Sequence, residues 1–270
     1  MHSAYRRAIA SPANSLIKVF RRALAGGTTK QGWLAVEGPF LVEEALNAAP
    51  RVKTHSVLVA TSAEEKFLAL LERLPPESEL TRVPDALFES VAQTESPQGI
   101  AALVELPSYS LEQVVSVSNA LLLVACRLQD PGNLGTIMRT ALAFSASAFL
   151  TLQETVSPFN PKAVRSSAGA IFRLPLVCGL DPKEALPVLS RHVRIVAAEC
   201  NGAAPITQAD LRGPIAILIG RESTGLPMDI ARHASELLSI PIRMEVDSLN
   251  AATAASIFLY EAARQRGFTY

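Results

Sequence analysis

Three short polar segments in the second half of this 270-residue chain hold side chains that can bind or transfer chemical groups. They are Asp130–Asn133, followed six residues later by Arg139, then Gly220–Gly225, and finally Asp247–Asn250. Taken singly, each segment is explained as well by a tight turn, a strand-to-helix connection or a helix cap. Arg139 is harder to explain, because a guanidinium in an otherwise apolar helix must reach an anion or water. The common position of the segments after predicted buried strands is what points to a shared site.

The signatures of several α/β enzyme classes are absent from this sequence. No G-x-G-x-x-G follows the apolar run 120–126, so a Rossmann dinucleotide site has no support. Residues 25–30, AGGTTK, lack the glycine spacing and the Ser/Thr of a P-loop, and neither G-x-S-x-G nor a His-rich metal motif occurs. Cys126, Cys178 and Cys200 are too widely spaced for a zinc site or a disulfide framework. We therefore expect no metal, and reduced thiols in a cytoplasmic protein.

The elements that must position these segments alternate between apolar strands and helices. We expect strands at 120–126, 148–152, 194–199, 215–220 and 237–241. The first of them is continuously apolar, as a strand buried on both faces should be. A helix is expected at 134–144, with further helices between the other strands. This alternation predicts an α/β fold with a mostly parallel sheet and a ligand pocket at the carboxyl ends of its strands.

The first half of the chain predicts a separate, smaller α/β unit. Its expected elements are, in order, a helix at 4–26 interrupted near Pro12, a strand at 33–38, a helix at 39–48, a strand at 56–60, a helix at 63–73 and a strand at 99–106. A polar stretch beginning at Pro107 is typical of a connector between domains. We therefore expect an N-terminal domain at 1–106, a linker at 107–118 and a second domain at 119–270.

The C-terminal helix predicted by the sequence is unusually free of charge. From Ala251 to Tyr260 no residue is charged, and most side chains are small. A helix that is uncharged on every side is expected to be buried on every side. Ser248 stands where the N-cap of this helix is expected. The end of the chain is therefore predicted to pack tightly rather than to fray.

Charge is balanced over the whole chain, with 25 basic and 25 acidic residues, but it is distributed unevenly. Residues 1–30 contain six basic residues and no acidic one. This basic stretch indicates either contact with nucleic acid or a membrane surface, or one solvated helix face. No apolar run approaches the length that spans a bilayer, so we expect no membrane insertion.

The polar segments, taken together and in their order, resemble the motifs of a known family. DPGNLGTIMRTALAF, ILIGRESTGLP and SIPIRMEVDSLNAATAASIFLYEA look like the three successive motifs of the SpoU-type (TrmH-like) RNA ribose 2′-O-methyltransferases of the SPOUT superfamily. SPFNPKAVRSSAGAIFRLPL is similar to the segment between the first two motifs. ASPANSLIKVFRRAL and WLAVEGPFLVEEAL resemble the family's N-terminal substrate-binding domain, which has a ribosomal-protein-like α/β fold.

The resemblance implies an S-adenosylmethionine-dependent enzyme that methylates a ribose 2′-hydroxyl. It also implies a C-terminal trefoil knot that forms the cofactor pocket, and a homodimer formed through the knotted domain. By the same resemblance, Gly220 and the backbone at Ile240 and Leu249, together with Leu218, hold the cofactor. Five polar residues match the family's catalytic set: Asn133, Arg139, Glu222, Ser248 and Asn250.

The implied roles of these side chains follow from the chemistry of methyl transfer to a hydroxyl. The family's counterpart of Arg139 is proposed to take the hydroxyl proton, but a guanidinium stays protonated, so binding a phosphate and stabilising the developing alkoxide suits it better. Ser248 and Asn250 are expected to orient the ribose or shape the cofactor turn. Glu222 is expected to support Arg139 or the second motif loop.

The implied partner is structured RNA, with ribosomal RNA favoured over transfer RNA because the added N-terminal domain resembles that of rRNA-directed members. Alternatives are tRNA ribose methylation, rRNA methylation that confers antibiotic resistance, and a non-catalytic RNA-binding or ribosome-assembly factor with the same fold. Seven basic residues are expected to contact RNA phosphates: Arg6, Arg7, Lys18, Arg21, Arg22, Lys30 and Arg165.

Overall fold

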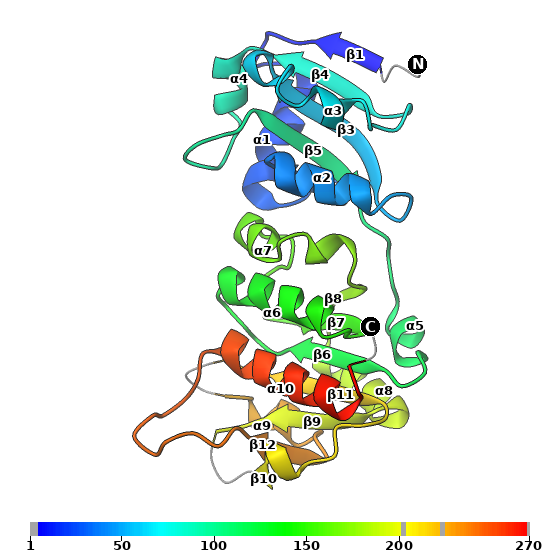
Figure 1. Cartoon of the computed structure of the whole chain (residues 1–270), viewed down its shortest axis with the longest axis vertical. Coiled ribbons are helices and arrows are strands. Elements are labelled where there is room, and N and C mark those ends of the chain that lie inside the picture. Colours follow the sequence, from blue (N-terminus) through cyan, green and yellow to red (C-terminus); the bar gives the residue numbers. More distant parts are fainter. Residues whose placement is uncertain (1–4, 201–203, 222–224, 269–270) are drawn as a thin grey trace. The chain divides into compact units, whose positions relative to one another are not determined.

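The computed structural model of the chain describes residues 5–200, 204–221 and 225–268, with side chains described from residue 7 onward (Figure 1). The chain divides into two compact units. The first comprises Met1–Pro107 with Phe159–Arg165, and the second comprises Ser108–Pro158 with Ser166–Tyr270. The sequence predicts contiguous domains, whereas the structure groups a short segment from the second half with the first unit.

The first unit is built on a mixed five-stranded sheet of order β1-β4-β3-β5-β2. Neighbours β1, β4 and β3 run parallel, and β5 pairs antiparallel with both β3 and β2. The strands are β1 (Tyr5–Ala8), β2 (Leu34–Glu37), β3 (Lys53–Ala60), β4 (Glu79–Val83) and β5 (Ile100–Glu105). The helices are α1 (Ser15–Gly26), α2 (Pro39–Asn47), α3 (Leu68–Leu71) and α4 (Asp85–Glu89), with a 3-10 turn at Thr61–Ala63.

Two helices predicted in this unit are partly wrong. Residues 4–26 are expected as one interrupted helix, but Tyr5–Ala8 form strand β1, and the helix begins only at Ser15 after the N-cap Asn14. The strand exists because its backbone pairs with β4, which is distant in sequence and therefore invisible to helical spacing. The predicted helix 63–73 is reduced to the 3-10 turn and the single turn α3.

The second unit contains a seven-stranded sheet of order β10-β12-β9-β11-β6-β7-β8, in which all neighbouring strands run parallel. Its strands are β6 (Leu121–Ala125), β7 (Ala148–Leu152), β8 (Leu176–Leu180), β9 (Arg194–Ala198), β10 (Ala204–Pro205), β11 (Ile215–Ile219) and β12 (Glu236–Ser239). The five strands that the sequence predicts here are confirmed, and β8 and β10 are additional.

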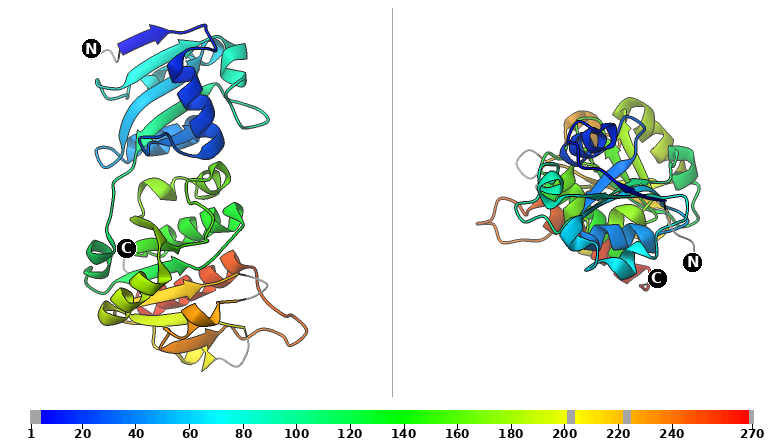
Figure 2. Two further views of the ribbon diagram at one scale, coloured as in Figure 1. Left: turned by 180° about the vertical axis from the view of Figure 1, so that it is seen from behind. Right: turned by 90° about the horizontal axis from the view of Figure 1, so that it is seen from above.

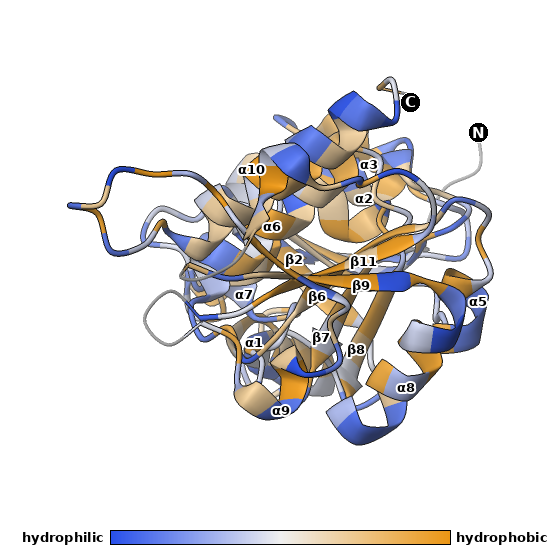
Figure 3. Ribbon diagram, turned by 90° about the horizontal axis from the view of Figure 1, so that it is seen from below, coloured by the Kyte–Doolittle hydropathy of each residue, from blue (hydrophilic) through white to orange (hydrophobic). Residues whose placement is uncertain are grey.

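Helices cover both faces of this sheet. α6 (Pro131–Ala143) and α10 (Ala251–Gln265) lie on one face, and α5 (Leu111–Val115), α8 (Pro182–His192) and α9 (Met228–Ala231) lie on the other (Figure 3). The unit also has 3-10 turns at Ala170–Phe172 and Ile206–Gln208, whereas α7 (Pro161–Ser166) lies almost entirely in the segment grouped with the first unit. Every residue of β6 and β11 is buried, which confirms the two-sided burial expected of continuously apolar strands.

Residues 107–118 are not the linker that their polar composition predicts, because most of them belong to the second unit. They contain α5, which begins with a reciprocal capping box between Ser110 and Gln113. The leucine and the two valines of α5 are buried in the core of the second unit. Apolar residues three and four positions apart after a capping sequence are the signal that the overall polarity hides.

The C-terminal helix α10 is present, but it is not buried on every side within one chain. It packs against α6 and β11 through buried residues such as Ala255, Phe258 and Leu259. Thr253 is exposed on another side, and half of the Tyr260 surface is exposed. None of the helices in the described part of the chain is long and apolar enough to cross a membrane.

Candidate active site

The first polar segment forms the start of helix α6. Asp130 is the N-cap, and its Oδ1 accepts a hydrogen bond of 2.7 Å from the backbone N–H of Asn133. Pro131 occupies the first turn, where a missing N–H costs nothing. The segment is therefore the helix start itself, and α6 begins earlier than the predicted 134–144.

The third polar segment forms the start of helix α10, with Asn250 rather than Ser248 as the N-cap. Asn250 Oδ1 accepts hydrogen bonds from the backbone N–H groups of Ala252, at 2.9 Å, and Thr253, at 3.3 Å. Ser248 is half-buried in the loop before the cap. Both residue types are good caps, and the helix starts at Ala251, so the cap falls on Asn250.

A direct hydrogen bond joins these two helix starts. Asn250 Nδ2 donates to Asn133 Oδ1 at 3.1 Å, between residues 117 positions apart in sequence. Further along the two helices, Ser256 Oγ and Thr140 Oγ1 lie 3.4 Å apart. The first and third segments therefore converge as the sequence predicts, and they place two helix N-termini, which carry partial positive charge, side by side.

The described residues of the second polar segment, Gly220, Arg221 and Gly225, lie together directly after β11, and we call them the closed turn. Arg221 and Gly225 exchange backbone hydrogen bonds of 3.2 and 3.0 Å, and Gly225 has a φ of +62°. A Cβ on Gly220 would lie 2.5 Å from the carbonyl oxygen of Gly225. Gly220 is therefore required by the protein's own backbone, which folds back against it, and not only by the approach of a ligand.

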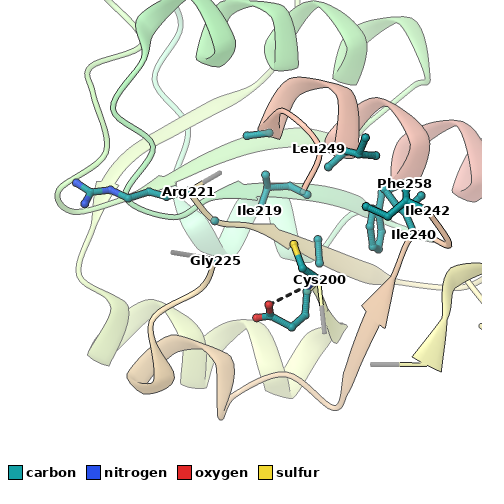
Figure 4. Close-up of a pocket in the computed structure, with 13 residues that line it drawn as sticks. Cys200, Ile219, Arg221, Gly225, Ile240, Ile242, Leu249 and Phe258 are labelled. Carbon is teal, nitrogen blue, oxygen red and sulfur yellow. Dashed lines mark hydrogen bonds between the residues drawn. The ribbon is translucent and has the colours of Figure 1, made fainter. Parts of the chain in front are cut away.

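The second and third segments line one cavity of about 570 Å³, part of which is open to solvent (Figure 4). The lining residues are Ala198, Glu199, Cys200, Ile219, Gly220, Arg221, Gly225, Ile240, Ile242, Leu249, Ala251, Ala254 and Phe258. Gly220, Ile240 and Leu249, which the resemblance assigns to the cofactor, are all among them. Leu218 is not: it is fully buried in the core of the unit.

Glu199 supplies the cavity with a carboxylate that the sequence prediction did not include. It follows β9, and its Oε1 accepts a 2.9 Å hydrogen bond from the backbone N–H of Cys200. A Cβ on Gly225 would lie 3.2 Å from the same oxygen, so the carboxylate lies close to the closed turn. Partial burial and the Glu199 charge raise the pKa of the Cys200 thiol. The sequence feature that could have pointed to Glu199 is its position at the end of a predicted strand, because the three polar segments also follow predicted strands.

Two arginines connect the closed turn to the end of β6. Arg221 Nε donates to the carbonyl oxygen of Arg127 at 2.8 Å, and its side chain points away from the apolar part of the cavity (Figure 4). Arg127 has a φ of +57°, and its guanidinium forms ion pairs with Glu154, at 3.3 Å, and Asp229, at 3.5 Å. The backbone conformation of Arg127 is unfavourable for a non-glycine residue. These contacts hold it and connect three loops around the site.

Of the other predicted catalytic residues that the structure describes, neither Arg139 nor Ser248 lines the cavity. Arg139 is exposed on α6 and has no hydrogen-bond or ion-pair partner among the described residues. Its exposure gives the guanidinium the contact with water that an arginine in an otherwise apolar helix requires. Glu222 lies outside the described residues. The cavity and the Asn133–Asn250 pair are therefore the assembled part of the site.

The basic residues predicted to contact RNA differ in their availability. Arg7 forms an ion pair with Glu79 at 3.3 Å, and Arg21 donates a 3.2 Å hydrogen bond to Ser90 Oγ. The side chain of Arg6 lies outside the described part of the chain. The other predicted residues are exposed: Lys18 and Arg22 on α1, Lys30 in the following loop, and Arg165 in α7.

Comparisons with known proteins match both units. The SpoU rRNA Methylase family matches residues 120–260, and the MRM3-like substrate binding domain matches residues 28–102. The 23S rRNA (uridine(2479)-2′-O)-methyltransferase of Streptomyces viridochromogenes is 31% identical over 74% of this chain and 72% of its own length. The 23S rRNA (guanosine(2553)-2′-O)-methyltransferase RlmP of Bacillus subtilis is 30% identical over 86% of this chain and 89% of its own.

Solved structures resemble the chain along nearly its whole length. The SpoU methyltransferase AviRb of Streptomyces viridochromogenes, in complex with the cofactor AdoMet, has a TM-score of 0.84 at 27% identity, covering 95% of this chain and 100% of its own. An AdoMet-bound rRNA methyltransferase of Sinorhizobium meliloti has a TM-score of 0.80 at 29% identity, covering 96% of this chain and 98% of its own.

Proposed function

Because the chain belongs to the SpoU rRNA Methylase family, we propose that it transfers the methyl group of S-adenosylmethionine to a ribose 2′-hydroxyl of ribosomal RNA. One observation carries the proposal. Gly220, Ile240 and Leu249 line a single cavity, although they come from two segments separated in sequence. Asn250, which follows Leu249 directly, is hydrogen-bonded to Asn133 of the first motif.

The cavity suits S-adenosylmethionine in both its apolar and its polar parts. Ile219, Ile240 and Phe258 offer apolar walls for an adenine ring, whose edge can be bound by backbone groups. Glu199 has a carboxylate that can accept hydrogen bonds from the hydroxyls of the adenosine ribose. The cofactor, when bound, supplies an electrophilic methyl group on a positively charged sulfonium. The residues of this chain must then hold it, align the acceptor hydroxyl and exclude water.

The polar side chains outside the cavity are assigned to the RNA. The Asn250 side chain donates to that of Asn133 and thereby joins the starts of α10 and α6, so the pair fixes the geometry of the edge at which a ribose is placed. Arg139 is exposed and permanently charged, which suits binding of a phosphate and stabilisation of the alkoxide that forms as the hydroxyl loses its proton. Ser248 and Glu222 remain predicted contributors to this edge.

Ribosomal RNA is favoured over transfer RNA because two relatives that match most of this chain are named as 23S rRNA 2′-O-methyltransferases. The match of residues 28–102 to a substrate binding domain supports a role of the first unit in RNA recognition. The exposed Lys18, Arg22 and Lys30 are its candidate phosphate contacts. A cytoplasmic location remains a prediction that agrees with this substrate.

We further propose that the second unit forms a homodimer and that its C-terminal segment is threaded as a trefoil knot. Three apolar residues of the loop before α10 support the dimer, because Ile242, Met244 and Val246 are all exposed in the single chain. This loop projects from the unit, as its orange trace shows (Figure 2). The packing of α10 against α6 and the Asn250–Asn133 bond support a C-terminal segment that returns to the first motif.

The proposed function is tested by incubating the protein with S-adenosylmethionine and rRNA from cells that lack the gene. Nucleoside mass spectrometry should then show one additional 2′-O-methylated ribose. Arg139→Ala should abolish transfer and leave cofactor affinity nearly unchanged by calorimetry, whereas Arg191→Ala, an exposed arginine on α8, should change neither. Failure to bind S-adenosylmethionine with or without RNA favours a non-catalytic RNA-binding factor. Equal loss of both properties in Arg139→Ala contradicts its assignment to the RNA.

A further inference from the structure

The only tryptophan of the chain forms a stacked pair with a histidine in the first unit. The ring centroids of Trp33 and His55 are 3.9 Å apart, and their planes differ by 12°. His55 Nε2 lies 2.9 Å from Glu105 Oε2, and this hydrogen bond fixes the imidazole in its plane. The pair is therefore an ordered aromatic surface at one end of the β2-β5-β3 part of the sheet.

The backbone directs both rings to this position. The pairing of β3 with β5 shifts between Thr54 and Ser56, so His55 is the extra residue of a β-bulge. Bulges re-aim side chains and are frequent beside functional sites. Trp33 is held by a tight loop. Its backbone N–H donates to Thr29 Oγ1 at 3.1 Å, and its backbone carbonyl accepts from the backbone N–H of Thr29 at 2.9 Å.

Burial does not explain why the two rings are stacked. Trp33 is only half-buried, and 29% of the His55 side chain is exposed. The large apolar side chains of this unit, such as Phe20 and Phe88, are instead fully buried in its core. The partial exposure of both rings leaves part of the pair accessible to a further flat partner.

The neighbouring charges favour a polyanion. Lys30 is exposed in the tight loop that holds Trp33, and Lys53 is exposed two residues before His55. Glu105, the acidic residue in contact with the pair, is engaged by the histidine. An aromatic surface flanked by lysines is the combination by which proteins bind unpaired nucleotides, with stacking for the base and ammonium groups for the phosphates.

We propose that Trp33 and His55 form a stacking platform for one unpaired base of the RNA substrate, and that Lys30 and Lys53 contact the adjoining phosphates. The inference rests on the proposed function, and it names an RNA contact of the first unit. Because both rings are held before binding, little side-chain entropy is lost when a base stacks. Stacking is tolerant of base identity, so the platform recognises an unpaired nucleotide rather than a sequence.

The single tryptophan makes the platform directly measurable. Its fluorescence should be quenched when the full-length protein is titrated with a short oligouridylate. An abasic oligonucleotide of equal length and charge should leave the emission nearly unchanged, because it offers phosphates without bases. Equal responses to the two probes, or no response to either, would show that no base stacks on Trp33 and would overturn the proposal.

Variants separate stacking from simple packing. Trp33→Ala should weaken binding of a dye-labelled oligouridylate by roughly 5- to 150-fold, the range expected for one lost base stack. Trp33→Phe should retain most of the affinity, and Phe40→Ala, which removes another exposed aromatic ring from the same unit, should not change it. An affinity of Trp33→Ala equal to that of Phe40→Ala contradicts the platform. If the platform is contradicted in this way and the wild type still methylates rRNA, the proposed function stands without the platform. If the wild type fails to methylate rRNA, the proposed function is wrong, whatever the fluorescence quenching shows.

Discussion

Asn250 has two separable tasks, because its carbonyl oxygen caps α10 while its amide nitrogen donates to Asn133. Asn250→Ser keeps a capping oxygen but is too short to reach Asn133. We expect this variant to lose only a few tenths of a kcal/mol of stability, and about 10- to 100-fold in kcat/KM because the edge of the site is no longer fixed. Asn250→Ala should show the same loss of activity and should in addition lose about 1 kcal/mol of stability, because the capping oxygen is removed. Urea unfolding and methyl-transfer kinetics measure the two effects. Equal activity of Asn250→Ser and wild type would limit Asn250 to capping.

Gly220 tests how tightly the closed turn is packed. Gly220→Ala places a Cβ 2.5 Å from the backbone oxygen of Gly225, so the turn must move away from the end of β11. Overpacking of this kind costs about 1–3 kcal/mol. We expect S-adenosylmethionine affinity to fall at least about tenfold, the equivalent of 1.4 kcal/mol. Isothermal titration calorimetry measures this loss.

The control for Gly220→Ala is Gly26→Ala, because a Cβ at Gly26 would meet nothing within 4 Å. This variant should bind the cofactor as the wild type does. Wild-type affinity in Gly220→Ala would mean that the turn adapts without cost, and that the glycine is not needed for the shape of the cavity.

The residues of the site are predictable from sequence where backbone position decides their place. Gly220, Ile240 and Leu249 reach one cavity because each follows the end of a strand or precedes a helix in the motif order. Leu218 differs from them because the alternation of side chains along β11 turns it into the core. Glu199 was not predicted, since a single acid at a strand end is common and its proximity to Gly225 exists only in three dimensions.

At the scale of elements, α10 is fastened at both ends, by Asn250 at its start and by Arg266 at its end. The Arg266 guanidinium donates to backbone carbonyls of Asn119, Leu211 and Gly213, at the opposite end of the sheet from the cavity. It is half-buried, and burial lowers its pKa. These contacts join the chain end to the amino ends of β6 and β11 without any carboxylate.

Arg266→Ala should therefore loosen the whole C-terminal helix. It leaves partly buried carbonyl oxygens without a charged donor, which we expect to cost about 2–3 kcal/mol and to lower the midpoint of urea unfolding. Arg264→Ala is the matched control, because the exposed Arg264 pairs with Glu261 one turn earlier on the same helix, and Glu261 keeps a hydrogen bond from Gln265 when the arginine is removed. A helical ion pair at this spacing contributes only about 0.2–0.5 kcal/mol, so its removal should have a much smaller effect. Equal effects would contradict the anchoring role of Arg266.

The predictability of elements follows the same physical distinction. β6 and β11 are predicted correctly because strands covered on both faces are apolar at every position, and β7 departs from this only at the buried Thr151. β1 is missed, because a four-residue edge strand is defined by the partner that it pairs with. α5 is missed because its three apolar residues are hidden in a polar stretch.

At the scale of the whole molecule, the uncovered apolar surface of the second unit is the testable feature. Met244 is 99% exposed in the loop between β12 and α10, and Tyr260 of α10 is half exposed. The same loop supplies Ile240 and Ile242 to the cavity, so in the proposed dimer its conformation links assembly to cofactor binding. We expect the wild-type protein to be a dimer by light scattering at micromolar concentration.

Met244→Arg should shift this dimer towards the monomer, weakening association by roughly 30-fold or more, as expected when a buried apolar anchor is replaced by a charge. It should also weaken S-adenosylmethionine binding, because the loop that lines the cavity loses its support. Met228→Arg is the matched control: this methionine is 82% exposed on α9, outside the loop, and its replacement should leave both mass and affinity unchanged. A wild-type monomer, or a Met244→Arg dimer as stable as the wild type, would show that the loop is not the interface.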